Sequence, residues 1–231
     1  MHSPARAHFI RKTTAAAVAA AAGEAPRPDA TQYELHLAQL AEHRRALKQI
    51  KSVQRKVEFK AKVLPEYLPY IEGVLEADSG APDDVVTTVM VWCIDTGHFH
   101  RALTIAEYVL RHKLALPDQY QRDAACVVAE EIAEYALRLL ADPKAEFDAV
   151  ELIEQLQQTA ELVDGHDMPD EVSAKLQKAL GYALRDSDPA AALEHLQKAL
   201  ALSPNCGVKK DIERLERALK NAQPAANKAR G

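Results

Sequence analysis

The sequence predicts an all-α protein, and three observations support this fold class. Aromatic residues make up only 5% of the 231 residues, there are 8 glycines, and helix-forming Leu, Ala, Glu, Lys and Arg dominate. That composition favours helices and disfavours a β-sandwich or barrel. Apolar side chains recur at helical spacing through most of the chain. The only β-branched run, at 85–91, follows a Pro-Asp-Asp sequence that is typical of a helix start.

The net charge of −5 is an average over segments of opposite sign. Residues 1–64 carry 12 basic and 5 acidic side chains, residues 65–208 carry 10 and 26, and residues 209–231 carry 7 and 3. Such asymmetry is typical of a protein in which one electropositive region meets a polyanion. The alternative is that the basic segments are solvated helix faces without a partner.

Charge and helix breakers together divide the chain into four segments. They are a mobile basic arm at 1–30, a long basic helix at 31–64, an acidic body of helical hairpins at 65–207, and a charged C-terminal helix and tail at 208–231.

The arm contains Arg6, Arg11 and Lys12 before an Ala-rich run from Ala15 to Ala22. That run is too weakly apolar for the core of a signal peptide. We expect a basic arm that becomes helical on binding, with a leader that has no role as the alternative.

The long helix is predicted to begin at Thr31, which forms a capping box with Glu34. No Pro or Gly follows until Pro65, so an uninterrupted helix of about 30 residues would be about 45 Å long. Its apolar residues follow a heptad-like spacing, which predicts a coiled-coil-like seam for self-association. The candidate oligomerisation residues are Leu37, Leu40, Leu47, Ile50, Val57 and Leu64.

The same segment carries most of the candidate DNA contacts. On one straight helix, five of its cations would fall within a sector of about 60°, which suits a row of phosphates. Few side chains there could read bases, so we expect contacts dominated by the DNA backbone. The alternative is a coiled coil with a solvated basic face. With the arm included, the candidate DNA-binding residues are Arg6, Arg11, Lys12, Arg44, Arg45, Lys48, Lys51, Arg55, Lys56, Lys60 and Lys62.

Beyond Pro65 the sequence predicts a succession of helices with short connections. They are expected at about 82–96, 99–112, 121–140, 145–163, 170–185, 189–202 and 208–220. The sequences at 97–102 and 180–204 partly match a tetratricopeptide unit, so we expect hairpins of degenerate tetratricopeptide-like character.

No motif predicts a self-contained catalytic or metal site. Cys93, His98 and His100 lack a fourth ligand and a known zinc spacing, and the three cysteines form no disulfide framework. The carboxylate pairs Asp83/Asp84, Glu130/Glu131 and Asp167/Asp170 could in principle hold Mg²⁺, but acidic residues at helix starts are already explained by capping. A P-loop and a nucleophile motif are both missing from the sequence. We therefore expect no catalytic residue, no metal and no cofactor.

Several sequence blocks resemble the small terminase subunit of peduovirus-type tailed phages. They are spread over about 90% of the chain, and they include the blocks at 1–5, 30–34, 64–69, 73–76, 88–97, 167–172, 174–176, 193–197 and 207–217.

The resemblance implies a role in phage DNA packaging in the cytoplasm of the bacterial host. In that family the small subunit binds the packaging site on concatemeric double-stranded DNA. It forms a homo-oligomer, often a ring, and recruits the large subunit, which carries the ATPase motor and nuclease. The family also carries the label endonuclease subunit, although no nuclease or ATPase motif is present here.

Two other functions stay open at this point. One is a helical-repeat adaptor that binds proteins and never touches DNA, and the other is a metal-dependent DNA endonuclease. No membrane partner is expected, because no apolar run approaches the roughly 20 residues that span a bilayer.

Overall fold

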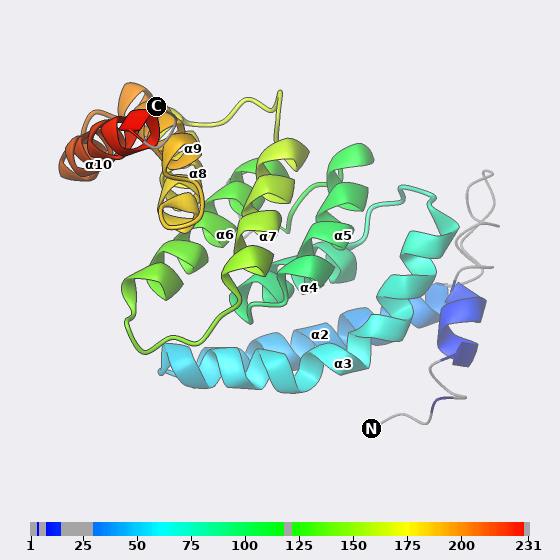
Figure 1. Cartoon of the computed structure of the whole chain (residues 1–231). Coiled ribbons are helices and arrows are strands. Elements are labelled where there is room, and N and C mark those ends of the chain that lie inside the picture. The colour runs from blue at the N-terminus through cyan, green and yellow to red at the C-terminus, as the bar shows by residue number, and fades with distance from the viewer. Residues whose placement is uncertain (1–3, 5–7, 15–29, 118–121, 229–231) are drawn as a thin grey trace. The chain divides into compact units, whose positions relative to one another are not determined.

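The computed structural model describes residues 4, 8–14, 30–117 and 122–228, and these contain helices and no strand (Figure 1). The all-α prediction is therefore confirmed. Residues 8–14 form a short helix. The helices that follow are α2 (Ala30–Gln49), α3 (Val53–Ala77), α4 (Asp84–Asp95), α5 (Phe99–Arg111), α6 (Ala124–Ala141), α7 (Ala149–Leu162), α8 (Asp170–Leu184), α9 (Pro189–Leu202) and α10 (Lys209–Lys228).

The chain divides into two compact units, Met1–Ala124 and Ala125–Gly231. The helices expected beyond Pro65 are present within a few residues, except that α10 extends to Lys228 rather than ending near residue 220. The finer division into four segments stays a prediction.

The basic segment is two helices rather than one, which corrects the expectation of an uninterrupted helix over 31–64. The α-helical pattern stops after Gln49 and restarts at Val53. Ser52 is the N-cap of α3, with extended backbone angles and a hydroxyl that accepts a hydrogen bond from the Arg55 amide at 3.3 Å. Serine at this position satisfies an amide that has no partner inside the helix. A single serine without an acidic residue in the following turn was too weak a signal to predict the break.

The second helix also continues through the point where the sequence predicted its end. Both Pro65 and Pro69 lie inside α3, which ends only at Ala77 and has Asp78, a residue in the left-handed conformation, as its C-cap. Each proline removes one backbone donor and bends a helix rather than necessarily stopping it. Figure 1 shows the axis of α3 changing direction along its length.

The first unit is organised around α4, which packs against α2, α3 and α5. Every residue of α4 from Val85 to Ile94 is buried. Asp83 caps this helix by accepting from the amides of Val85 at 2.8 Å and Val86 at 3.0 Å. The capping interpretation of the Asp83 carboxylate is therefore supported by its hydrogen bonds.

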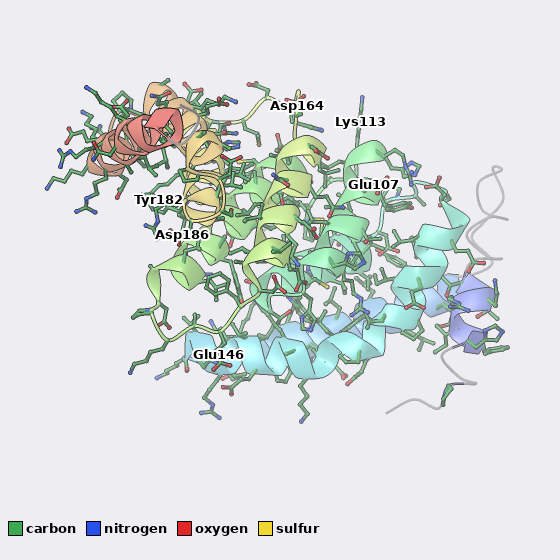
Figure 2. All side chains as sticks on the ribbon, viewed as in Figure 1. Glu107, Lys113, Glu146, Asp164, Tyr182 and Asp186 are labelled. Carbon is green, nitrogen blue, oxygen red and sulfur yellow. The ribbon has the colours of Figure 1, made fainter. Side chains whose placement is uncertain are left out.

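In the second unit, α8 packs along α9, and α9 packs against α10. The approach of α8 to α9 is close at Gly181, where an added Cβ would lie 2.5 Å from Leu196 Cδ2. Tyr182, labelled in Figure 2, donates from its hydroxyl to Asp211 Oδ2 at 3.0 Å and so joins α8 to α10. The tetratricopeptide-like character of these hairpins stays a prediction.

Candidate nucleic-acid interface

The turn between α2 and α3 gathers cations at the end of a helical hairpin. No acidic residue occurs from Arg44 to Val57. Lys48 lies in the last turn of α2, and no acidic residue lies in the first turn of α3. The partial positive charge at the start of α3 is offset by the partial negative charge at the end of α2, so the positive field at this turn comes from the side chains.

Most of these cations face solvent. Lys48, Lys51 and Arg55 are exposed, and Lys56 is half-buried. Among the described residues, none of these four side chains has an ion-pair partner. We call these four residues the basic tip. A group of cations without carboxylate partners is available to neutralise phosphates.

Two further predicted DNA contacts flank the basic tip. Arg45 is exposed, and its Nε donates to the carbonyl of Ala41 at 3.3 Å. Lys62 is exposed on α3, seven residues after Arg55, so the two residues share one face of the helix.

Two other predicted contacts point toward the protein instead. Arg44 is half-buried and donates to the Thr88 hydroxyl on α4 at 2.6 Å. Lys60 pairs with Asp95 at the end of α4, with only 17% of the lysine side chain exposed. The straight-helix projection placed Arg44 on the same stripe as Lys48 and Arg55. That row of cations is not continuous in the structure, because α2 ends at Gln49, between Lys48 and Arg55.

The arm is described only in part. Arg6 lies outside the described residues. Arg11 and Lys12 belong to the short helix 8–14 and form ion pairs with Glu72 at 3.7 Å and Glu76 at 2.6 Å on α3. The pKa of Glu76 is held below its ordinary value, chiefly by its hydrogen bond with Lys12. The structure therefore places these two cations against carboxylates.

The predicted oligomerisation residues fall into two groups. Leu40 and Leu64 are 0% and 4% exposed, so they belong to the core of the first unit. Leu37, Leu47, Ile50 and Val57 are half-buried. Some of the apolar residues with heptad-like spacing are therefore buried within a single chain, where α2 and α3 pack against α4. The self-association surface stays a prediction.

Aromatic contacts hold the hairpin in position. The Tyr67 hydroxyl lies 2.7 Å from His43 Nδ1, and the Tyr67 ring meets Trp92 edge-on at a centroid distance of 6.0 Å. His36 stacks on Tyr70 at 4.4 Å. Burial raises the pKa of Tyr67 well above its ordinary value, so its hydroxyl stays protonated. These contacts fix α2 against α3 and α4 and thereby position the basic tip.

The candidate zinc residues do not converge. Cys93 is buried, and burial raises the pKa of its thiol to about 12, which disfavours the thiolate that zinc requires. His98 and His100 are exposed, and His98 Nδ1 lies 2.8 Å from the Thr96 hydroxyl. Within the part of the chain that the structure describes, no group of three or more His, Cys, Asp or Glu side chains is arranged to hold a metal ion.

Two of the carboxylates considered for Mg²⁺, Asp83 and Glu130, have structural partners. Asp83 caps α4 and also accepts from the Tyr70 hydroxyl at 2.5 Å. Glu130 pairs with Lys175 at 2.9 Å. Both arrangements use the carboxylate for packing between helices rather than for chemistry.

The second unit contains a cavity of about 410 Å³ that the sequence did not predict. Its lining combines apolar Val163 and Leu202 with His166 and Lys198. The residues come from the end of α7, the connection between α7 and α8, and one face each of α8 and α9, and no local motif joins these segments.

Together these features define an all-helical protein with a basic helical hairpin. The family model described as phage small terminase subunit matches residues 37–171, which is more than half of the chain. The chain belongs to the phage small terminase subunit family and has a role in phage DNA packaging.

One relative extends the similarity over nearly the whole sequence. The protein named "Terminase, endonuclease subunit" of Escherichia phage P2 is 45% identical over 221 residues, covering 95% of this chain and 87% of the relative. The resemblance noted in the sequence is thereby confirmed. No solved structure matches the chain. None of the described helices is long and apolar enough to cross a membrane.

Proposed function

We propose that this chain is the DNA-recognising adaptor of a phage packaging machine in the host cytoplasm. It binds the packaging site on concatemeric double-stranded DNA through the basic tip. It assembles with further copies into a closed ring, and it recruits the large subunit that carries the ATPase and nuclease. The observation that best supports this proposal is the cluster of cations at the turn of the α2–α3 hairpin, where Lys48, Lys51 and Arg55 are exposed and Lys56 is half-buried.

The chemistry of the basic tip favours contacts with phosphates. Gln49 and Gln54 are the only amide side chains beside these cations, so few donors could distinguish bases. Sequence preference would then come mainly from the shape and flexibility of the DNA.

Assembly would multiply a modest charge. One chain offers only a few free cations, which gives weak and strongly salt-dependent binding. Several copies held together would engage several phosphate segments at once, so the overall affinity would exceed that of each contact. This argument supports a ring over a single chain as the DNA-binding form.

Replacing Lys48, Lys51 and Arg55 by glutamine tests the basic tip. We expect the slope of log affinity against log salt to fall by about 3 for each subunit in contact with the DNA, because each lost phosphate contact removes roughly 0.9. Fluorescence anisotropy with a labelled duplex, measured from low to moderate salt, gives both slopes.

Two matched variants control this measurement. Lys48→Arg, Lys51→Arg and Arg55→Lys keep the charge and should keep the slope. Lys209→Gln, Lys210→Gln and Arg217→Gln remove three exposed cations from α10 and should change it little. An unchanged slope in the tip variant would assign DNA binding to another surface. No binding by the parent protein at low salt would favour the adaptor that contacts only proteins.

A further inference from the structure

The short helix 8–14 is seated on α3 at a position that only glycine permits. A Cβ added at Gly73 would lie 2.6 Å from Thr14 Cβ and 2.7 Å from the Arg11 carbonyl oxygen. Both distances are far below normal contact between nonbonded atoms. The absence of a side chain at Gly73 is therefore what lets helix 8–14 lie against α3 (Figure 1).

The seat buries a small part of the helix. Thr14 is 0% exposed and Ile10 is 9% exposed, whereas Phe9 is 62% exposed. In addition, the Thr14 hydroxyl and Arg11 Nε are buried without a hydrogen-bond partner among the described residues. Unsatisfied buried polar atoms oppose docking, because in water both groups would be hydrogen-bonded. The seat is thus specific in shape and weak in polar pairing.

The remaining attraction is electrostatic and partly solvated. The Lys12–Glu76 pair has side chains 53% and 43% exposed, and the Arg11–Glu72 pair 39% and 52%. Ion pairs with this exposure are weak and are screened by salt. A denser array of anions can therefore compete for the same two cations.

We propose that residues 8–14 form a basic latch whose Arg11 and Lys12 exchange between Glu72 and Glu76 on α3 and the phosphates of bound DNA. This inference rests on the proposed DNA-binding function. With the latch seated, the two cations are neutralised by α3. With the latch released, they add two phosphate contacts to those of the basic tip.

The length of the chain permits this exchange. Fifteen residues, 15–29, join the latch to α2, and that many residues reach at most about 50 Å. Along α3, Gly73 lies 18 residues after Arg55, which corresponds to about 27 Å. A released latch would therefore reach DNA that is held at the basic tip.

Gly73→Ala separates latch release from unfolding. Alanine favours the interior of a helix, so α3 itself should not be weakened. The added methyl group would displace the latch. We expect faster hydrogen exchange at the amides of residues 8–14, tighter DNA binding, and a salt slope steeper by about 2, for two added phosphate contacts.

A second pair of substitutions approaches the same state by another route. Glu72→Gln with Glu76→Gln keeps the seat and removes its charges, so it should also release Arg11 and Lys12. The matched control Glu154→Gln with Glu161→Gln removes two exposed carboxylates from α7 in the second unit, and it should leave the salt slope unchanged. Adding Arg11→Gln and Lys12→Gln to Gly73→Ala should abolish the gain.

The outcomes distinguish this proposal from the proposed function. If hydrogen exchange shows release in Gly73→Ala but the salt slope stays at the parent value, the latch does not contact DNA and the inference is overturned. It is also overturned if adding Arg11→Gln and Lys12→Gln leaves the slope of Gly73→Ala unchanged. A parent protein that binds no DNA at any salt concentration overturns both proposals, whereas normal parent binding with no effect at Gly73 overturns the latch alone.

Discussion

Asp83 shows how one side chain joins local structure to packing. Its carboxylate accepts from two amides at the start of α4 and from the Tyr70 hydroxyl of α3, and the residue is 7% exposed. A buried carboxylate is costly unless donors compensate it, and here three donors do so. Two helices of the first unit are therefore held together by the group that caps one of them.

Asp83→Ala should lower the free energy of unfolding by about 2–4 kcal/mol, because it removes the cap of α4 and the hydrogen bond that the buried Tyr70 hydroxyl donates to the carboxylate. Asp83→Asn should cost less, since an amide oxygen still accepts. Asp148→Ala is the matched control: Asp148 caps α7 from an exposed position, so its loss should cost about 1 kcal/mol. Urea denaturation followed by circular dichroism measures all three. Equal losses for Asp83→Ala and Asp148→Ala would contradict the role of Tyr70.

At the scale of whole helices, the close packing of α8 against α9 depends on one glycine, Gly181. Ala192 and Leu196 of α9 lie in the core cluster of the second unit, and Leu196 occupies the space above Gly181. The axes come close because α8 presents no side chain at that point. A small residue inside a helix thus sets the distance between two helices.

Gly181→Ala should therefore destabilise the protein by about 1–3 kcal/mol by overpacking, although alanine is the better helix former. Ala218→Gly, at an exposed position inside α10, isolates the effect of helix propensity and should cost about 1 kcal/mol. Thermal unfolding of both variants gives the comparison. A gain in stability for Gly181→Ala would show that Leu196 moves aside without cost.

Helix content followed from the sequence, whereas helix continuity did not. Proline and glycine are the strongest sequence signals for a helix end. They therefore predict that the basic helix ends at Pro65, and they predict no break at Ser52. Bending at Pro65 and Pro69 is tolerated because the flanking residues Leu64 and Tyr67 are buried in the core. The Ser52 cap is a short local signal that competes with strong helix formers on both sides.

The sequence predicts where the cations of the candidate DNA-binding surface lie along the chain, but not which of them contact other parts of the protein. Lys48, Lys51 and Arg55 are exposed, as a DNA contact requires. Arg44 and Lys60 bind groups on α4, a segment about 30 to 45 residues away in sequence. No helical projection of one segment could show those partners, because they are brought together only by the tertiary fold.

At the scale of the whole molecule, the two compact units differ less in charge than the sequence segments on either side of residue 64. The first unit carries 16 basic and 15 acidic residues, and the second carries 13 and 19. The basic tip is therefore a local feature of a nearly neutral unit. Its field comes from how the charges are arranged, and assembly would bring several such tips together.

Self-assembly predicts that the free protein has a mass several times 25.4 kDa in light scattering. Val57→Asp alters a half-buried candidate contact and should lower that mass while leaving the circular dichroism spectrum unchanged. Leu40→Asp buries a charge in the core and should instead unfold the first unit. A monomeric parent protein would contradict the ring.

The continuity of α3 has a consequence for rotation as well as reach. Arg55 and Gly73 are separated by 18 residues, or about five full turns, so in a straight helix they share one azimuth. An insertion or deletion of a single residue between them would turn one about 100° relative to the other while changing the length by only about 1.5 Å. Pro65 and Pro69 bend α3 between these two residues, so the relation describes their positions around the helix axis and not two parallel directions in space.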